Sequence, residues 1–450
     1  MRTSGTVAKY LARYAVPEAR LPLALPNRYE HVLVVPALGE SVSFLDGIRS
    51  AYEPDPASGE AERGLLLLVV NAAPDTPPAL RAKNHELMLE LEAGARARKT
   101  LHHEPSIRWF DLGEFDAIVV DRSGPDHLLP ERQGVGLARK LGADLALAFK
   151  ARGLIRAQGF GSTDADTTLP VGYFGAGERA LASAEAAVFP FVHAPSSEAL
   201  LDRATLAYEL SLRYYVLGLC AAGSNYAYHS LGSTLYVGFE AYAHVRGFPR
   251  LRAGEDFYLL DKLAKLGAVC RLYDPLIRIE ARRSARVPFG TGPGVQRLLD
   301  ASAGPEGLLL YAPRSFLVLG EVLASLAEFA HTRDAGGMRQ RLAALPEARA
   351  VLSYLDALGI AEVLPDALRH AKNPDQLSRR LGVWFDALRS LRLIHALRDH
   401  CHPALPWRQA LAEAPFLRVH ASSLQSAVAE LRQRELCVAP TVGVRGQGIG

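Results

Sequence analysis

Short apolar runs alternate with longer helical patterns along the first half of the chain. The apolar runs of strand length occupy residues 31–36, 65–70, 115–120 and 155–160. The longest helical patterns between them occupy residues 78–99 and 134–150. Strands that are apolar on both faces are typical of parallel sheets, and their alternation with helices places helices on both sides of the sheet. The pattern therefore predicts an α/β fold with a mostly parallel sheet flanked by helices.

The pattern changes near residue 304. Before that point, further strands and helices are expected at residues 186–192, 197–219, 234–237, 239–245 and 255–266. Beyond it, Leu, Ala and Arg recur at the three-to-four spacing of amphipathic helices. We therefore predict an α/β domain and an all-α C-terminal domain, preceded by a proline-containing arm and followed by a flexible tail. Their expected bounds are residues 28–300, 304–440, 1–27 and 441–450, respectively.

Composition limits the classes of function. The 450 residues are 49% hydrophobic and 22% charged, which is ordinary for a folded protein, and a net charge of +3 without a basic stripe gives no indication of a nucleic-acid partner. The four cysteines are too widely spaced for a metal pair and are expected to be reduced thiols. Neither a signal peptide nor a run of about 18 uncharged apolar residues is apparent. We expect a cytoplasmic protein with no transmembrane segment, and peripheral membrane contact through Arg-rich C-terminal helices stays open.

Two aspartates follow the fourth apolar run. Asp164 and Asp166 lie two residues apart after Gly161, and on extended backbone their side chains would share one face. Two like charges on one face repel each other unless a cation lies between them, and carboxylate oxygens are ligands that suit Mg²⁺ or Mn²⁺. We expect a metal site here, and the alternative is a solvated acidic turn.

Polar side chains also follow other predicted strands. They are Asn71, Asp75 and Asp121. Parallel α/β sheets bind ligands beyond the carboxyl ends of their strands, so several polar residues on one rim are expected of a nucleotide and metal site. Polar residues also end strands for purely structural reasons, which is the alternative interpretation.

A second acidic pair begins a predicted helix. Glu255 and Asp256 follow Gly254, and the helix continues with apolar residues at helical spacing. Carboxylates at a helix N-terminus offset the helix dipole by about 0.3 to 1 kcal/mol, so a structural role alone can explain them. The same alternation of elements connects this pair to the upstream aspartates, which favours a functional role.

An arginine-rich segment at residues 282–286 leads into a glycine-containing loop. Arg283 and Arg286 follow Arg282 in this segment. Guanidinium groups bind diphosphates and other anions through two parallel hydrogen bonds, so the segment is a candidate clamp for such a group. Arginines on a solvated edge strand are the alternative.

Four motifs follow one another in order along the chain. They are Val-Pro-Ala-x-x-Glu at residues 35–40, Gly-x-x-x-Ala-Arg-Lys-x-Gly at 134–142, Thr-Asp-Ala-Asp at 163–166, and Gly-Phe-Pro at 247–249 followed by Ala-Gly-Glu-Asp at 253–256. Together they resemble the family 2 glycosyltransferases, which have the GT-A fold. The likeness covers residues 28–290 and lies in the ordered combination, because each motif alone is weak. It implies a GT-A type nucleotide-binding sheet and transfer of a sugar, with inversion, from a UDP- or GDP-sugar donor to an acceptor of unknown identity.

The resemblance also implies residue roles. Asp166 would hold a divalent metal on the donor diphosphate, with Asp164 on the ribose or on metal-bound water. Asp256 would be the general base, with Glu255 beside it. The remaining donor-binding residues would be Glu40, Asn71, Asp75, Asp121 and Arg139, with Arg283 and Arg286 from the arginine-rich segment. The family usually has an acidic pair where this chain has Asn71-Ala72-Ala73, so its contacts to the nucleotide base differ here.

Two other functions fit parts of the same pattern. A nucleotidyltransferase uses a similar sheet and metal, but it normally has a glycine-rich basic loop directly after the first strand, where this chain has Pro-Ala-Leu-Gly-Glu at residues 36–40. A non-catalytic nucleotide-sugar-binding or scaffold protein would keep the sheet, and the retained acidic pairs argue against it. The QxxRW motif of processive family members is lacking, because only Gln296-Arg297 occurs near the expected place, which disfavours polymer synthesis.

Overall fold

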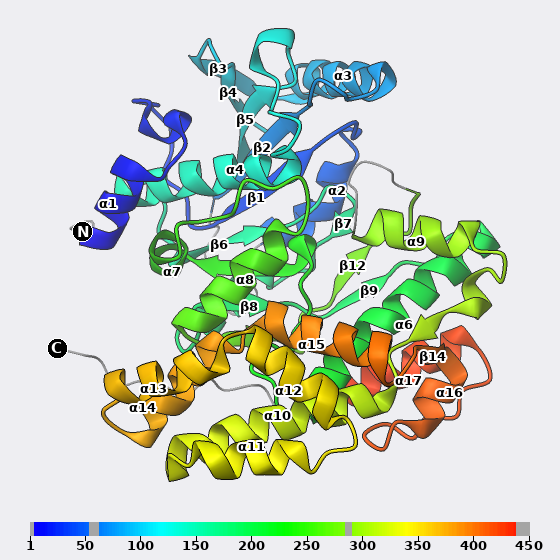
Figure 1. The fold of residues 1–450 in the computed structure, drawn as a ribbon. Coiled ribbons are helices and arrows are strands. Elements are labelled where there is room, and N and C mark those ends of the chain that lie inside the picture. The colour runs from blue at the N-terminus through cyan, green and yellow to red at the C-terminus, as the bar shows by residue number, and fades with distance from the viewer. Residues whose placement is uncertain (1–3, 54–62, 284–289, 438–450) are drawn as a thin grey trace. The chain divides into compact units, whose positions relative to one another are not determined.

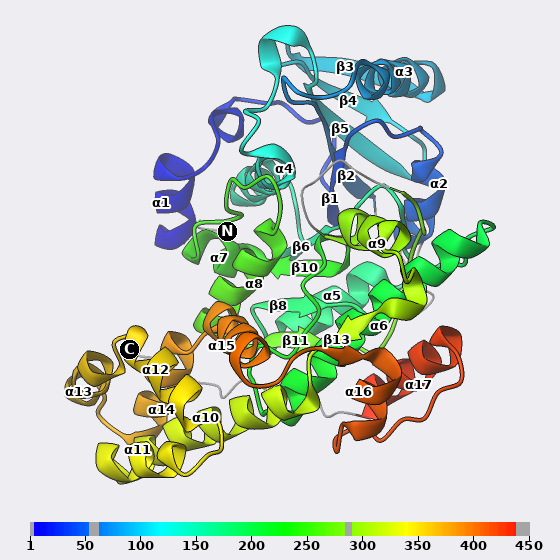
Figure 2. The same ribbon diagram turned by 45° about the vertical axis from the view of Figure 1, so that its right-hand side comes forward.

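The computed structural model of the chain describes residues 4–53, 63–283 and 290–437, which form two compact units. The first unit consists of the described residues of Met1–Ser196 and Ser230–Pro293. The second consists of those of Ser197–His229 and Gly294–Thr441. Figures 1 and 2 show the labelled elements of both units in two views. Residues 197–229, which the sequence pattern grouped with the α/β domain, thus belong to the second unit.

A nine-stranded sheet with strand order β11-β8-β10-β6-β1-β2-β5-β4-β3 forms the centre of the first unit; Figure 1 labels seven of its strands, and Figure 2 labels β10 and β11. The strands are β1 (Val32–Ala37), β2 (Gly64–Asn71), β3 (Ala97–His102), β4 (Ile107–Asp111), β5 (Phe115–Arg122), β6 (Gly159–Ser162), β8 (Ala186–Val188), β10 (Leu235–Gly238) and β11 (Val269–Arg271). Strands β6, β1, β2 and β5 pair in parallel, and only β10 and β4 run against the other seven. The residues that follow β1 and β6 therefore meet at one edge of the sheet, and the predicted mostly parallel α/β fold is confirmed.

Helices cover the sheet of the first unit. They are α1 (Gly5–Arg13), α2 (Phe44–Arg49), α3 (Pro78–Gly94), α4 (Gly134–Ala151), α5 (Tyr173–Leu181), α7 (Phe239–His244) and α8 (Glu255–Leu266), with short 3₁₀ turns at Pro17–Arg20, Ser50–Tyr52, Pro125–His127 and Gly232–Thr234. Helix α4 packs on β1 and β2. Gly142 permits this close contact, because a Cβ atom at this position would lie 2.5 Å from Val34 Cγ1.

A second, three-stranded sheet brings a distant part of the chain to the end of β6. Its order is β7 (Thr167–Thr168), β12 (Ile277–Ile279) and β9 (Phe191–His193). Directly beyond β12, the Glu280 backbone N–H donates to the Asp166 carbonyl oxygen over 2.8 Å. This pairing places Arg282, the first residue of the arginine-rich segment, beside Asp166.

The bounds of two predicted elements differ from those that the sequence pattern indicates. The helix expected to reach residue 99 stops at Gly94, and Ala97–His102 forms the edge strand β3, whose exposed charged side chains hide its strand character. The single strand expected at residues 186–192 is divided at Pro190 into β8 and β9, which belong to different sheets. Proline has no N–H to donate to a strand ladder, which explains the break.

The segment predicted as an N-terminal arm contains helix α1 and packs against α4. Tyr10, which is 1% exposed, donates to Asp144 Oδ1 over 2.5 Å, and the Val16 backbone N–H donates to Asp144 Oδ2 over 2.8 Å. Lys140 neutralises the same carboxylate at 3.0 Å. Asp144 therefore fixes the N-terminal segment to the first unit.

The second unit is helical, as the C-terminal pattern predicts. Its elements are α6 (Ala199–Ala221), α9 (Thr291–Asp300, which begins in the first unit), α10 (Pro313–Thr332), α11 (Ala335–Ala343), α12 (Ala348–Ala357), α13 (Ile360–His370), α14 (Pro374–Trp384), α15 (Ala387–His400), α16 (Trp407–Glu413) and α17 (Leu424–Cys437), with a 3₁₀ turn at Pro305–Gly307 and the short strands β13 (Leu309–Leu310) and β14 (Leu405–Pro406). Glu209 of α6 accepts from Arg213 Nε and from Arg432 Nε of α17, each over 2.7 Å. This buried ion pair network joins the first and last helices of the unit.

Among the described residues, one helix, α10, is long and apolar enough to cross a membrane, judged by length and composition alone. Half of its most apolar stretch is buried within the structure. Phe316, Leu319, Val322 and Phe329 are each 0% exposed and belong to the core of the second unit. The helix thus has the packing of a core helix.

Candidate functional site

The buried guanidinium of Arg139 on α4 brings the two acidic pairs together. Its Nε donates to Glu255 Oε1 over 2.8 Å, and its Nη2 donates to Asp164 Oδ1 over 2.6 Å. Nη1 donates to Ser162 Oγ over 3.1 Å, and the arginine side chain is only 3% exposed. The end of β6 and the start of α8, which are far apart in the sequence, are therefore held at one centre. We call Glu40, Asp164, Asp166, Glu255 and Asp256 the acidic site.

Local geometry places the acids of α8 at the first turn of the helix. Gly254 has a φ of +77°, a left-handed conformation that glycine adopts without strain. The helix begins at the next residue, so Glu255 and Asp256 lie among the backbone N–H groups of its N-terminus. Glu255 is 3% exposed and faces Arg139, which explains how a buried carboxylate is tolerated here.

Asp256 has the electrostatic properties of a proton acceptor near neutral pH. Its Oδ1 accepts from the Phe257 backbone N–H over 2.7 Å. Burial raises the pKa of Asp256 to about 7, and the neighbouring charge of Glu255 adds to the rise. The positive charge of Arg139 opposes this rise without cancelling it. A carboxylate with this pKa can take up a proton in the neutral range.

A second arginine, Arg282, lies on the other side of the acidic site. Its two terminal nitrogens donate to the Glu40 carboxylate over 2.8 and 3.0 Å. Its Nε lies 2.8 Å from Asp166 Oδ2 in an ion pair without hydrogen-bond geometry. Arg282 therefore connects the loop after β1 with the turn after β6, two segments that the sequence places far apart.

The acidic site keeps an excess of negative charge. Among the described residues, Arg139 and Arg282 form ion pairs with four of its five carboxylates, namely Asp164, Glu255, Glu40 and Asp166. Burial raises the pKa of Asp166 to about 6, and Arg282 opposes the rise. The negative charges of Asp164 and Glu40 raise this pKa further. Additional positive charge at this place would stabilise the ionised form of Asp166.

Asp164 and Asp166, the residues expected to hold a metal, have the oxygen ligands that a divalent cation needs. In this structure they form ion pairs with Arg139 and Arg282. Ala165 and Asp166 lie in a turn, so the expectation that Asp164 and Asp166 share a face on extended backbone is wrong. Within residues 4–53, 63–283 and 290–437, no group of three or more His, Cys, Asp or Glu side chains is placed to hold a metal ion. Two carboxylates completed by substrate oxygens and water are nevertheless a common Mg²⁺ site, and the excess negative charge suits a cation.

The amide side chains near Glu40 hold the ends of β1 and β2 together. Asn71 Nδ2 donates to the Ala37 carbonyl oxygen over 3.0 Å, and Asn84 Nδ2 donates to the Asn71 carbonyl oxygen over 2.9 Å. Asn84 Oδ1 accepts from the Gly39 backbone N–H over 2.7 Å. Asn84, which the sequence pattern did not single out, is 0% exposed within an otherwise amphipathic helix, and this burial is visible only in the fold.

Two other predicted donor-binding residues, Asp75 and Asp121, have partners elsewhere. Asp75 pairs with Arg252 Nη2 at 2.9 Å. Asp121 Oδ1 accepts from the Ser123 backbone N–H and hydroxyl over 2.9 and 2.7 Å, which closes the turn after β5. Arg283 is exposed, and Arg286 lies outside the described residues. In the described part of the arginine-rich segment, Arg282 contacts the acidic site through Glu40 and Asp166.

Comparison with known proteins gives little. No protein-family model matches the chain, and no curated protein matches it. Two crystal structures of TarS residues 1–349 from S. aureus are similar to it at 14% sequence identity. The structure in complex with UDP-GlcNAc has a TM-score of 0.33, with 79% of this chain and 91% of that chain covered. The other has a TM-score of 0.31, with 79% and 90% covered. At these TM-scores the likeness carries no weight in the argument that follows.

Proposed function

We propose that the chain is a glycosyltransferase that moves a sugar from a UDP- or GDP-sugar to a hydroxyl group of an acceptor, with inversion at the anomeric carbon. The observation that carries this proposal is the convergence of Asp164 and Glu255 on Arg139, with Asp256 at a pKa of about 7 beside them. The four ordered motifs that resemble family 2 glycosyltransferases meet at this centre. The proposal extends to a cytoplasmic setting, as expected from the sequence.

Asp256 is the general base of the proposed reaction. It takes the proton of the acceptor hydroxyl as the acceptor oxygen forms its bond to the anomeric carbon. The bond between that carbon and the donor diphosphate breaks, and the nucleoside diphosphate leaves with the electron pair. A single displacement of this kind needs one base on the face opposite the leaving group. Arg139 and Glu255 hold the start of α8 so that this base keeps its position.

The donor diphosphate is proposed to bind at the other end of the acidic site. Asp164 and Asp166 would hold Mg²⁺ or Mn²⁺ there, and the bound cation would act as a Lewis acid that stabilises the charge of the departing diphosphate. Arg282 is already in contact with Asp166, and its guanidinium is of the type that binds phosphate oxygens through parallel hydrogen bonds. Glu40 keeps this guanidinium in place until the donor arrives.

Nucleotide binding is the first test of this function. We expect one nucleoside diphosphate or nucleotide sugar, with Mn²⁺, to raise the melting temperature of the protein. At 100 times its Kd, such a ligand adds about 2.7 kcal/mol to the free energy of unfolding. The shift should require Mn²⁺ and should disappear in Asp166→Ala, but it should persist in Asp126→Ala, which changes an exposed aspartate outside the acidic site. The absence of a shift with every UDP and GDP compound would sink the proposal, and a shift without release of nucleoside diphosphate from any donor would favour a non-catalytic binding protein.

The pH dependence of transfer should report Asp256. A base acts in its ionised form, so kcat/KM should fall as the pH drops through about 7. Glu255→Gln removes the negative charge that helps to raise the pKa of Asp256, so the acidic limb of the profile should move to lower pH. Glu131→Gln, at an exposed glutamate that pairs with Arg252, should leave the profile in place. An unchanged limb in Glu255→Gln would show that another group controls it.

A further inference from the structure

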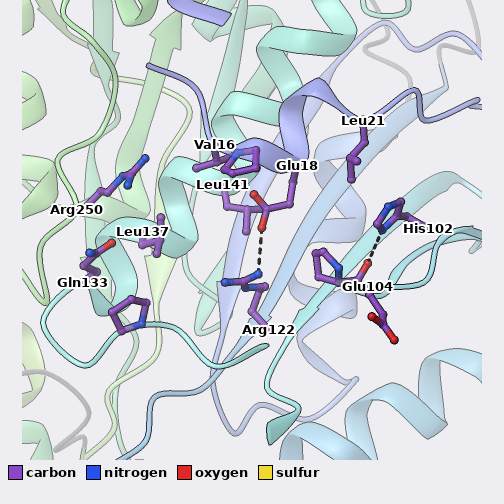
Figure 3. A pocket seen from close by; sticks show the side chains of 13 residues that line it. Val16, Glu18, Leu21, His102, Glu104, Arg122, Gln133, Leu137, Leu141 and Arg250 are labelled. Atoms are coloured by element: carbon purple, nitrogen blue, oxygen red, sulfur yellow. Dashed lines mark hydrogen bonds and ion pairs between the residues drawn. The ribbon is translucent and has the colours of Figure 1, made fainter. Parts of the chain in front are cut away.

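A cavity of about 490 Å³ in the first unit lies apart from the acidic site (Figure 3). Gln133, which directly precedes α4, and Leu137 and Leu141 of α4 line the cavity. They are four residues apart, so they lie on one face of the helix. Arg139 is two positions from Leu137 and from Leu141, which places it on the opposite face. No residue of the acidic site lines the cavity among the residues that the structure describes. The cavity and the acidic site thus lie on different faces of α4.

The wall of the cavity is largely apolar. Val16 and Leu21 of the N-terminal segment and Leu137 and Leu141 of α4 line it, together with Pro17, Pro105 and Pro130. The volume lies in the range of small-molecule sites, which typically have apolar walls and a few polar groups that orient the ligand. The cavity therefore suits a compact molecule with an apolar body.

Hydrogen-bond donors with no protein acceptor face the cavity. Arg122 Nη1 donates to Glu18 Oε1 over 3.1 Å, which leaves its other terminal nitrogen without a hydrogen bond in the described part of the chain. Within the same residues, Arg250 makes no hydrogen bond or ion pair, and the side-chain amide of Gln133 makes no hydrogen bond. Three donor groups, two of them cationic, are thus free to bind a ligand.

The charges are arranged along the cavity. Figure 3 shows Arg250 and Gln133 on one side, His102 and Glu104 on the opposite side, and the Arg122–Glu18 pair between them. Burial lowers the pKa of Lys140, Asp144 opposes this shift, and the nearby charge of Arg250 makes a smaller contribution to the lowering. The end of the cavity at Arg250 is therefore positive, and the end at Glu104 is negative.

We propose that this cavity binds a small organic anion with a single acidic group, separately from the proposed donor site. Its acidic group, a carboxylate or a phosphate, lies at Arg250, Gln133 and the free nitrogen of Arg122. Its apolar body packs on Leu137 and Leu141. Glu104 at the far end repels a second negative group, which selects a ligand with one acidic end.

The test uses the full chain and three probes with an aromatic body. They are 4-phenylbutyrate, phenyl phosphate and, with the charge reversed, 4-phenylbutylamine. We expect isothermal titration to show binding of one or both anions and none of the amine, and the stronger anion identifies the acidic group. Arg250→Ala should weaken this binding about tenfold or more, because it removes a charge-assisted hydrogen bond. Arg132→Ala, at an exposed arginine that does not line the cavity, should bind the anions as the wild type does.

Two controls separate this site from the donor site. Asp166→Ala should leave binding of the anions unchanged, so the result does not depend on the proposed glycosyl transfer. Arg250 is exposed and makes no ion pair in the described chain, so Arg250→Ala should melt at the wild-type temperature. Equal binding in wild type and Arg250→Ala, equal binding of the amine, or no binding of either anion to the wild type would each overturn the proposal.

Discussion

Asp256→Asn should lower kcat for sugar transfer by about 10² to 10⁴-fold, the usual contribution of a positioned general base. Asparagine has nearly the same shape and can still accept from the Phe257 backbone N–H, so the start of α8 should keep its geometry. It cannot take up the proton of the acceptor hydroxyl. The loss should therefore fall on kcat, while the affinity for the nucleotide sugar stays within a few-fold of the wild-type value.

The matched control for this variant lies on the same helix. Asp261→Asn changes a carboxylate that pairs with Lys265 at 2.7 Å and takes no part in the acidic site. It should retain the wild-type kcat. Both variants are compared in steady-state assays of nucleoside diphosphate release, with the donor identified by the thermal shift. Retention of kcat in Asp256→Asn would remove Asp256 from the role of base and would direct attention to Glu255.

Arg139→Met should lower the free energy of unfolding by about 3 to 5 kcal/mol. Methionine fills much of the same volume, but it leaves Glu255, whose side chain is 4% exposed, as a buried carboxylate without its partner. It also removes the hydrogen bond to Asp164. The cost arises from the unpaired charge, so the double variant Arg139→Met/Glu255→Gln should be more stable than Arg139→Met alone.

Denaturant unfolding of the variants measures this effect. Arg252→Met is the control, because Arg252 is exposed and its pairs with Asp75 and Glu131 are of the surface type that contributes about 0 to 1 kcal/mol. A loss in Arg139→Met no larger than that in Arg252→Met would show that Arg139 does not hold the acidic site together. A double variant as unstable as the single one would assign the loss to packing.

Strands β1, β2 and β5 of the first unit were predictable because their burial is apparent from the local sequence. In β1, β2 and β5, the Val and Leu residues are buried on both faces, and such strands appear as continuous apolar runs. Edge strands lack this signal. Ala97–His102 has exposed charged residues, so residues 97–99 have the pattern of a helix end. The pairing of this strand with β4 depends on contacts that the local sequence does not encode.

The acidic residues were predictable as pairs, but their partners were not. Asp164 and Glu255 carry local signals, an Asp-x-Asp after a strand and carboxylates at a helix start. The roles of Arg139 and Arg282 depend on which side chains the fold brings near them, across 116 and 242 positions of sequence. The predicted donor site names Arg283 and Arg286 and leaves out Arg282, because neighbouring arginines carry the same local signal and only the fold shows that Arg282 contacts Glu40 and Asp166.

The sequence by itself determined the α/β class, the change to a helical pattern near residue 304 and the identity of the acidic pairs, because periodic burial and short motifs depend on neighbouring residues. Only the tertiary structure decided that Arg139 joins the two pairs, that Arg282 spans Glu40 and Asp166, and that the pKa of Asp256 rises to about 7. Burial and Coulomb interactions depend on distances in space, and these follow from the packing of α4, β6 and α8 around one guanidinium.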